Sequence, residues 1–220
     1  MVPSLRVEQG CWDGGDEVVV GVDEVGRGAW AGPLTVGAVV LPRSGRVNGI
    51  RDSKLLTPAR RVQLFGRIDE WASGWAVGHA SETECDELGM SEAQRLATRR
   101  AIDALDLPVD RVLVDGSWNF VDWLPSLAIV KGDRTCLSIA AASVMAKVVR
   151  DDLMVEASEH YRPYGFDANK GYPAPQHRIA LTGYGPSAIH RRSWAFMDAL
   201  PWTGLQRRSR PVPQGQLFAA

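Results

Sequence analysis

A series of short apolar runs rich in β-branched residues constrains the fold of this chain more than any other feature. Such runs at residues 18–25, 34–41, 75–79, 111–114 and 127–130 predict buried strands. Segments with helical periodicity lie at residues 58–71, 91–105, 138–160 and 175–181. Because two strands come first and strands and helices then alternate, we expect an α/β domain built on a mixed sheet.

Local signals mark the expected helix boundaries. Thr57 followed by Pro58 is typical of a helix start, and Ser91 is the expected N-cap of the next helix. The apolar face of the helix after Pro58 would be supplied by Val62, Leu64, Phe65 and Ile68. Small residues at 140–143 open the long helix and would permit close packing against a sheet.

Length and cysteine content set the broad class of the protein. The 220 residues suit one globular domain with a small appendage. Cys11, Cys85 and Cys136 are odd in number and far apart, which predicts a reduced, cytoplasmic protein. No signal peptide is evident, and the most apolar stretch, residues 137–146, is too short to span a bilayer. We therefore expect no membrane association.

Charge is unevenly distributed along the chain. Residues 170–220 contain seven Lys or Arg and one acid, which gives +6, and the remainder carries −7. A basic end on an acidic body fits an anionic partner. Charge alone still favours a solvated basic tail over a binding site.

Acidic residues lie at the ends of three expected strands, each near a glycine: Asp23-Glu24, Asp115 and Asp133. Each alone is more simply structural, because Asp before Gly is an ordinary turn signal. Together they favour a shared site, since converging carboxylates repel one another unless a cation lies between them. Oxygen ligands without nearby His or Cys indicate Mg²⁺ or Mn²⁺. Two such ions, about 4 Å apart, would suit in-line phosphodiester hydrolysis.

The pair Asp23-Glu24 poses a geometric problem, because neighbouring side chains on a strand point to opposite faces. Either the strand bends near Gly26, or Glu24 contributes its main-chain carbonyl. The segment is neither a dinucleotide-binding loop nor a P-loop, because the spacing of its glycines differs and no Gly-Lys-Ser/Thr follows.

Seven motifs in order carry a specific family resemblance. They are GVDEVGRG (21–28), DSK (52–54), VDG (114–116), KGD (131–133), SIAAASVMAKVVRD (138–151), KGYPAPQH (170–177) and HRRSW (190–194). In these motifs the chain resembles bacterial ribonuclease HII, the type 2 ribonuclease H. The resemblance implies an RNase H-like mixed β-sheet flanked by helices, with a small helical C-terminal segment. We therefore expect an N-terminal extension (1–17) and a catalytic domain (18–202, helical from about 160). The polar residues after Pro201, with their Pro, Gly and Gln content, predict a disordered tail (203–220).

The resemblance also assigns roles to residues of this chain. It implies that catalysis and metal binding fall to Asp23, Glu24, Asp115 and Asp133. The GRG segment, Gly26, Arg27 and Gly28, is associated with reading the ribose 2′-hydroxyl through the main chain. Tyr172 is expected to stack on the sugar beside the ribonucleotide. The expected phosphate contacts are Ser53, Lys54, Ser143 and Lys147. Three positions depart from the family pattern and bear on substrate affinity rather than chemistry: Ala29, Leu55 and Asn169.

We expect a Mg²⁺- or Mn²⁺-dependent endonuclease acting on RNA–DNA hybrids and on ribonucleotides embedded in duplex DNA. A metal-bound water would attack 5′ to the ribonucleotide, giving 5′-phosphate and 3′-hydroxyl ends, in ribonucleotide removal and DNA replication or repair. Alternatives are a non-catalytic nucleic-acid-binding module and a junction-resolvase-like nuclease on the same fold. In the tail, Gln214, Leu217 and Phe218 resemble the short peptide by which bacterial replication proteins dock on the sliding clamp.

Overall fold

The computed structural model describes residues 2–201. Its strands are β1 (Val19–Val25), β2 (Leu34–Val40), β3 (Gly74–Ala80), β4 (Arg111–Asp115) and β5 (Ser126–Ile129). Its α-helices are α1 (Arg6–Asp13), α2 (Pro58–Trp71), α3 (Glu82–Asp103), α4 (Gly132–Thr135), α5 (Leu137–His160), α6 (Phe166–Asn169) and α7 (Pro175–Tyr184). Short 3₁₀ turns are η1 (Ser53–Leu55), η2 (Arg162–Tyr164) and η3 (Ala195–Ala199).

The strands form a five-stranded sheet in the order β3-β2-β1-β4-β5. The first three strands are antiparallel neighbours, whereas β4 pairs parallel to β1 and β5 parallel to β4. The expected mixed sheet is therefore confirmed. Because β1, β4 and β5 run in the same direction, their carboxyl ends lie at one edge of the sheet.

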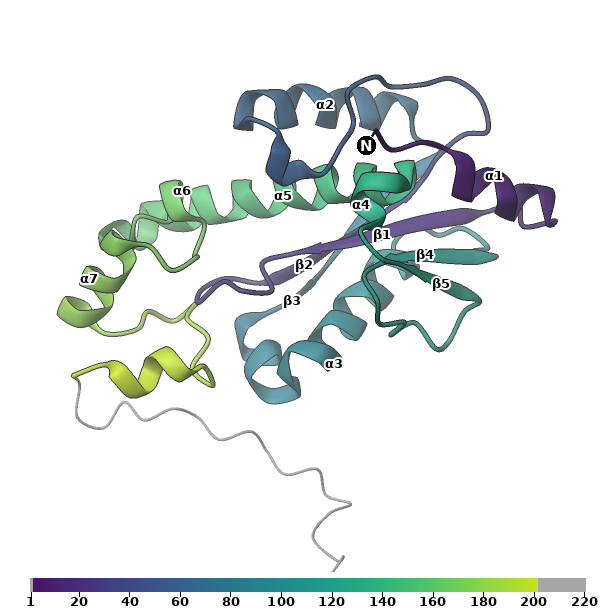
Figure 1. Ribbon diagram of the computed structural model, residues 1–220. Coiled ribbons are helices and arrows are strands. Elements are labelled where there is room, and N and C mark those ends of the chain that lie inside the picture. Colours follow the sequence, from purple (N-terminus) through teal and green to yellow (C-terminus); the bar gives the residue numbers. More distant parts are fainter. Residues whose placement is uncertain (1, 202–220) are drawn as a thin grey trace, which may run out of the picture.

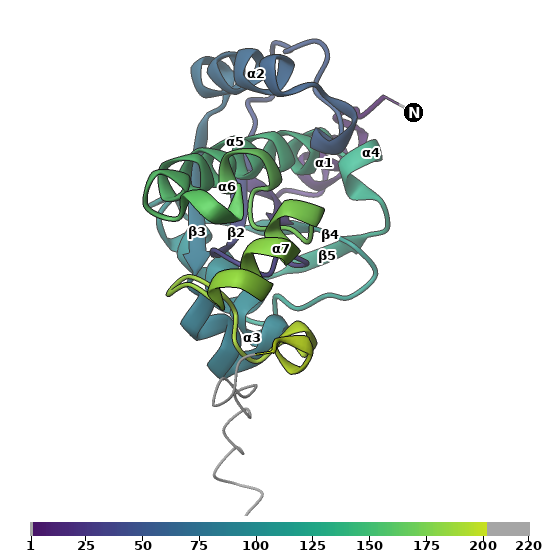
Figure 2. The same cartoon turned by 90° about the vertical axis from the view of Figure 1, so that its left-hand side faces the viewer.

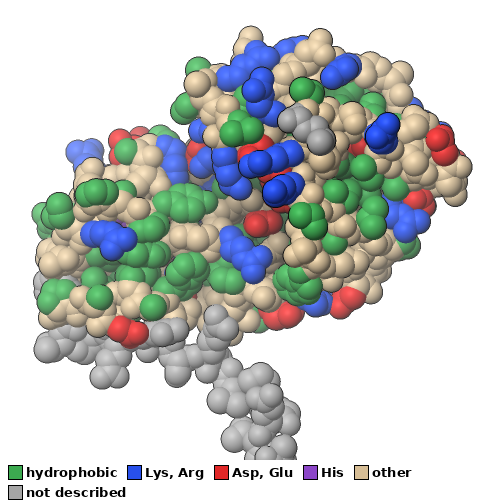
Figure 3. All heavy atoms as spheres, in the orientation of Figure 1, with side chains coloured by type: hydrophobic (Ala, Val, Ile, Leu, Met, Phe, Trp, Pro, Cys, Tyr) green, Lys and Arg blue, Asp and Glu red, His purple; other side chains and the backbone are tan. Residues whose placement is uncertain are grey.

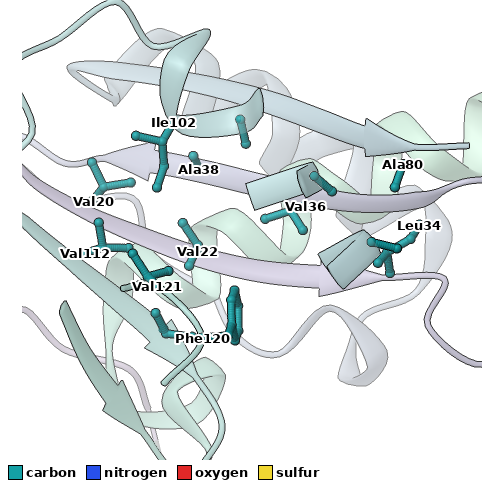
Figure 4. Close-up of a cluster of buried hydrophobic side chains, with 14 of the residues drawn as sticks. Val20, Val22, Leu34, Val36, Ala38, Ala80, Ile102, Val112, Phe120 and Val121 are labelled. Carbon is teal, nitrogen blue, oxygen red and sulfur yellow. The ribbon is translucent and has the colours of Figure 1, made fainter. Parts of the chain in front are cut away.

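Helices cover both faces of the sheet (Figures 1 and 2). On one face α3 packs its alanines, Ala93, Ala97 and Ala101, against the valines of β1, β2 and β4. Figure 4 shows this core, in which Phe120 and Val121 of the loop after β4 close one side. On the other face α5 packs on the sheet and α2 packs on α5.

Helix α5 lies unusually close to the strands, as its small residues predict. A Cβ atom at Gly37 of β2 would lie 2.5 Å from the carbonyl oxygen of Ala142. A Cβ at Gly21 of β1 would collide with the main chain of Ser138. Glycine at these two strand positions and alanine on the helix together allow this close approach. As a result Ser143 of α5 lies beside Asp23 of β1.

Two details of the helices differ from expectation. The helix expected from Ser91 corresponds to the second part of α3, and a first part that was not expected begins at Glu82, where Ser81 and Glu84 form a reciprocal capping box. Helix α3 kinks at Gly89, where φ is +76°, and Ser91 is an exposed residue within it. Helix α2 begins as predicted, with the Thr57 hydroxyl accepting from the N–H of Arg60. Val62 is 60% exposed, so its assignment to the apolar face is wrong.

Both ends of the described chain contain structure around the central layers. The segment expected as an N-terminal extension contains α1, which buries Trp12 against Val19, Leu113 and Ile139. At the other end, α6, α7 and η3 surround a separate apolar cluster that includes Phe166 and Leu181. The predicted tail lies outside the described residues. The division into domains stays a prediction.

Within residues 2–201 no helix combines the length and apolar character needed to cross a membrane. Cys11, Cys85 and Cys136 are free thiols in this part of the chain.

Candidate active site

The structure brings the acidic strand ends together at one edge of the sheet. Asp23 lies in β1, Asp115 is the last residue of β4, and Asp133 follows β5 in α4. The Asp115 carboxylate accepts hydrogen bonds from the N–H groups of Gly132 (2.7 Å) and Asp133 (3.4 Å). The end of β4 is thereby joined to the turn that carries Asp133.

Asp23 and Glu24 leave opposite faces of β1. Pairing with β2 is unbroken from Val20 to Val25, so the strand does not bend at the acidic pair. Asp23 lies on the α5 side, near the hydroxyl of Ser143. Glu24 lies on the α3 side, where its carboxylate accepts from Gln94 (3.3 Å). The regular strand excludes the bend, so the main-chain carbonyl of Glu24 is the alternative that remains, and the Glu24 carboxylate lies on the other face of the sheet.

Burial and mutual repulsion disfavour the charged forms of these acids. Burial, with the negative charges of Glu24 and Asp115, raises the pKa of Asp23 well above its ordinary value. Burial also raises the pKa of Glu24, although Arg27 opposes the shift. Burial, then Asp115, raises the pKa of Asp133. A nearby cation would relieve this repulsion.

Lys54 is a cation that the chain itself brings to the acids. Burial acts to lower the pKa of Lys54, but the charges of Asp23, Asp52 and Asp133 outweigh it and raise that pKa. Asp52 holds the segment in place, because its carboxylate accepts from the N–H of Lys54 (3.0 Å) and lies 3.7 Å from the guanidinium of Arg134.

The donor set suits a hard divalent ion, but it is not a ready-made cage. Carboxylate oxygens are the ligands that Mg²⁺ and Mn²⁺ prefer. Among residues 2–201, no three His, Cys, Asp or Glu side chains are grouped closely enough to hold a metal ion as they stand. Side chains at this edge would therefore have to rotate towards an ion on binding it.

Gln94 of α3 is a residue of this region that the sequence analysis missed. Its side chain is buried, accepts a hydrogen bond from Arg27 (2.7 Å) and donates one to Glu24. It therefore links the GRG segment to the second acid of β1. No local pattern distinguishes this glutamine from any other helical glutamine, so the fold alone identifies it.

The GRG segment and Tyr172 are in direct contact. The N–H of Gly26 donates to the Tyr172 hydroxyl (3.0 Å), and the tyrosine ring lies 4.0 Å from the position of a Cβ at Gly28. Gly26 has φ of +88°, and a Cβ there would collide with the Arg150 side chain. Glycine is thus required at position 26 both by its backbone conformation and by the space available.

Two fully buried arginines hold the chain that follows β1. Arg150 of α5 donates to the carbonyl oxygens of Pro33 (2.8 Å), Lys170 (2.9 Å) and Ala31 (3.1 Å). Arg191 donates to the carbonyls of Gly32 and Arg27. Both guanidinium groups bond to main-chain oxygens, so they fix the path of residues 27–33 and of the turn before Tyr172.

The four expected phosphate contacts fall into two groups. Ser53 and Ser143 are buried and share a hydroxyl–hydroxyl hydrogen bond of 2.9 Å, so they do not lie on the surface as expected for phosphate contacts. Lys54 is exposed, and Lys147 is half-buried with its Nζ 5.7 Å above the Tyr172 ring. Lys147 also donates to Asp151 (2.7 Å).

A groove of about 360 Å³ runs from Tyr172 between α2 and α5. Its basic side chains include Arg61, Lys147 and Lys170, and Asp151 pairs with the first two. On the face seen in Figure 3, Lys and Arg side chains gather near the middle of the molecule around a few acidic atoms. This surface is suited to a polyanion.

The three positions that depart from the family pattern have different surroundings. Ala29 is fully buried, and Leu55 is 61% exposed beside Lys54. Asn169 stabilises the turn before Tyr172, because its amide donates to the carbonyl of Tyr164 (2.6 Å) and accepts from the N–H of Gly171 (2.8 Å).

Comparisons with known proteins identify the family of this chain. The family model of ribonuclease HII matches residues 20–197. A ribonuclease HII of Streptomyces avermitilis is 46% identical over 212 residues, covering 92% of this chain and 91% of that protein. Among solved structures, ribonuclease H2 of Pyrococcus horikoshii OT3 has a TM-score of 0.66 at 27% identity, covering 81% of this chain and 94% of that one. A complex of PCNA and ribonuclease HII from Archaeoglobus fulgidus has a TM-score of 0.70 at 25% identity, covering 81% and 95%.

Proposed function

Since the chain belongs to the ribonuclease HII family and is a ribonuclease H, we propose that it cleaves the RNA strand of hybrids and also cuts duplex DNA 5′ to single ribonucleotides. The products would carry 5′-phosphate and 3′-hydroxyl ends, and the cellular role would be ribonucleotide removal in DNA replication and repair, in the cytoplasm. The observation that carries the proposal is the gathering of acids at one sheet edge beside the Gly26–Tyr172 contact. Family membership favours this reading over a non-catalytic module or a junction resolvase.

Mg²⁺ or Mn²⁺ would be held chiefly by Asp23 and Asp115, which lie on neighbouring parallel strands. Asp133 would join them through the turn that the Asp115 carboxylate already organises. Glu24 would act from the opposite face of β1, oriented by Gln94. Bound divalent ions would activate water and stabilise charge on the leaving oxygen. The protein's own contribution would be to keep Asp23, Asp115 and Asp133 at one edge of the sheet, with Lys54 partly neutralising them in the free enzyme.

Discrimination of RNA from DNA would depend on the GRG segment and Tyr172. A ribose differs from deoxyribose by one hydroxyl, so the protein segment that recognises this hydroxyl must approach it closely. Gly28 is exposed and has no side chain to cover its main-chain groups, and the half-buried tyrosine ring lies beside it. Gly26 is buried and holds the tyrosine hydroxyl through its N–H. The groove lined by Lys147 and Lys170 would then bind the phosphate backbone on one side of the cleaved bond.

The test is cleavage of a duplex carrying one ribonucleotide, with and without Mg²⁺ or Mn²⁺. Asp23→Asn and Asp115→Asn should each lower turnover by at least about 100-fold, because each removes an anionic ligand. Thermal stability should be kept or raised, since like-charge repulsion falls. Asp103→Asn makes the same change on an exposed part of α3 and should leave turnover unchanged. Near-normal cleavage by either active-site variant would refute the assignment.

A second substrate tests the role of Tyr172. Tyr172→Ala should reduce cleavage at a single ribonucleotide more than cleavage of a long hybrid, where many sites compete. Tyr172→Phe keeps the ring but removes the oxygen that accepts from Gly26, so it separates stacking from positioning. Equal losses on both substrates with a lower melting temperature would make the tyrosine a packing residue only.

We also propose that the tail docks on a sliding clamp through Gln214, Leu217 and Phe218, residues outside the described structure. The Archaeoglobus relative was solved in complex with PCNA, which supports a partner of this class. A peptide spanning residues 210–220 should bind purified bacterial clamp, and Leu217→Ala with Phe218→Ala should abolish binding. Binding that both substitutions leave unchanged would exclude this mode.

A further inference from the structure

Two histidines lie buried directly behind Tyr172. His177 of α7 and His190 are 0% and 1% exposed, and their Nε2 atoms are 2.8 Å apart. The rings of Tyr164 and Phe166 pack against both of them. Neither histidine belongs to the acidic site, and neither is within reach of solvent.

The hydrogen bonds around the pair fix the position of each proton. The main-chain N–H of Ser187 donates to Nδ1 of His190 (2.9 Å), so that nitrogen carries no proton. The proton of a neutral His190 is therefore on Nε2, where it is donated to Nε2 of His177. His177 must then carry its proton on Nδ1, and this N–H donates to the carbonyl oxygen of Tyr172 (2.9 Å). Every ring nitrogen is satisfied when both imidazoles are neutral.

Protonation of either ring would place two N–H groups against each other. Burial, then the neighbouring His177 and Arg192, lowers the pKa of His190 to about 3. Burial and Arg178 lower the pKa of His177, although its bond to Tyr172 opposes the shift. The pair therefore stays neutral near pH 7, and its bonding direction runs one way, from Ser187 to Tyr172.

This series of hydrogen bonds, from Ser187 through the two histidines, ends at the carbonyl of Tyr172, whose side chain contacts the GRG segment. The Tyr172 carbonyl is held by His177, its hydroxyl accepts from Gly26, and its ring lies under the Arg150 guanidinium at 5.5 Å. The main chain of Tyr172 is thus held relative to the GRG segment by the bond from His177 to its carbonyl and by the bond from its own N–H to the carbonyl of Asn169 (2.9 Å).

We propose that His177 and His190 are positioning residues that fix the main chain at Tyr172 through a one-way relay of hydrogen bonds, and so aim the tyrosine at the sugar beside a ribonucleotide. The inference rests on the proposed role of Tyr172 in substrate discrimination. It assigns a purpose to two buried imidazoles that take no part in the acid chemistry.

The relay itself is tested on the full-length wild-type protein, independently of activity. Long-range ¹H–¹⁵N correlation spectra should show His177 as the Nδ1–H tautomer and His190 as the Nε2–H tautomer. Neither should titrate between pH 5.5 and 8.5. An Nε2–H tautomer at His177, or titration of either buried ring near pH 6.5, would overturn the relay.

The positioning role is tested with a matched pair of variants. His177→Asn keeps an amide N–H where Nδ1 lies, and His177→Leu has none, while both lose the bond to His190. On the single-ribonucleotide duplex, His177→Leu should lower kcat/KM at least about tenfold more than it does on a long hybrid, and His177→Asn should recover most of that difference. If both variants lost kcat/KM equally on the single-ribonucleotide duplex and on the long hybrid, the two histidines would have only a structural role. Failure of the wild type to cut the single-ribonucleotide duplex would instead refute the proposed function and leave the tautomer result standing.

Discussion

Replacing Gly37 by alanine tests how the closeness of α5 to the sheet supports the site. Gly37 is buried in β2 and pairs with Asp23 across the β1–β2 ladder. The new Cβ would lie 2.5 Å from the Ala142 oxygen and 3.2 Å from the Ala146 methyl group. Ordinary contact begins at 3.4 Å, so α5 must retreat by about 0.9 Å, because main-chain atoms cannot rotate away.

The expected cost follows from two opposing effects. Overpacking of a close-packed interior typically costs about 1–3 kcal/mol. Alanine also lowers the conformational entropy of the unfolded chain, which offsets roughly 0.4–1 kcal/mol of that cost. The net loss of unfolding free energy should be about 1–2 kcal/mol, or roughly 2–8 °C in Tm for a chain of this size. Because α5 carries Ser143 and Lys147, the same shift should lower turnover on a hybrid substrate by about tenfold or more at a temperature where both proteins are folded.

Gly66→Ala is the matched control. Gly66 is exposed within α2, and a Cβ there meets no atom within 4 Å. This substitution should raise stability by about 0.5–1 kcal/mol, because alanine favours the helix, and should leave turnover unchanged. Urea denaturation of the three proteins measures the free energies. A Gly37→Ala protein as stable as wild type, alongside a stabilised Gly66→Ala, would refute the close-packing argument.

Three further perturbations probe other parts of the structure. Gln94→Leu should lower kcat on hybrids by about tenfold, because Glu24 and Arg27 lose their shared buried partner at a cost of about 1–3 kcal/mol; unchanged kcat would limit Gln94 to packing. Lowering the pH from 7.5 to 5.0 should remove about 2 kcal/mol of stability through His190, whose pKa falls from 6.5 to about 3 on folding, so that protons bind the unfolded state preferentially. The loss should be smaller by that amount in His190→Gln, and equal pH dependence of the two proteins would contradict the assignment. Glu8→Ala should lower Tm, since the buried carboxylate accepts from the Ser138 N–H (2.7 Å) at the start of α5; Glu8→Gln, which keeps an acceptor, should lose less, and equal losses would show that packing dominates there.

The sequence by itself determined the features that depend on local signals. The strands follow from short β-branched runs, and α2 follows from Thr57-Pro58, because a cap satisfies N–H groups only a few residues away. The ordered motifs were specific enough to identify the family. The capping box at Ser81 and Glu84 was equally local and readable, and the expectation of a later start at Ser91 overlooked it.

Tertiary structure alone decided how the site is held. The regular pairing of β1 with β2 put Asp23 and Glu24 on opposite faces, where the sequence had left a bend open. Gln94 meets Arg27 across 67 residues, and Arg191 meets the Arg27 carbonyl across 164. The His177–His190 contact likewise needs α7 and the chain after it to fold back on each other. Such contacts leave no periodic trace in the sequence, because each depends on where distant segments pack rather than on the residues beside it.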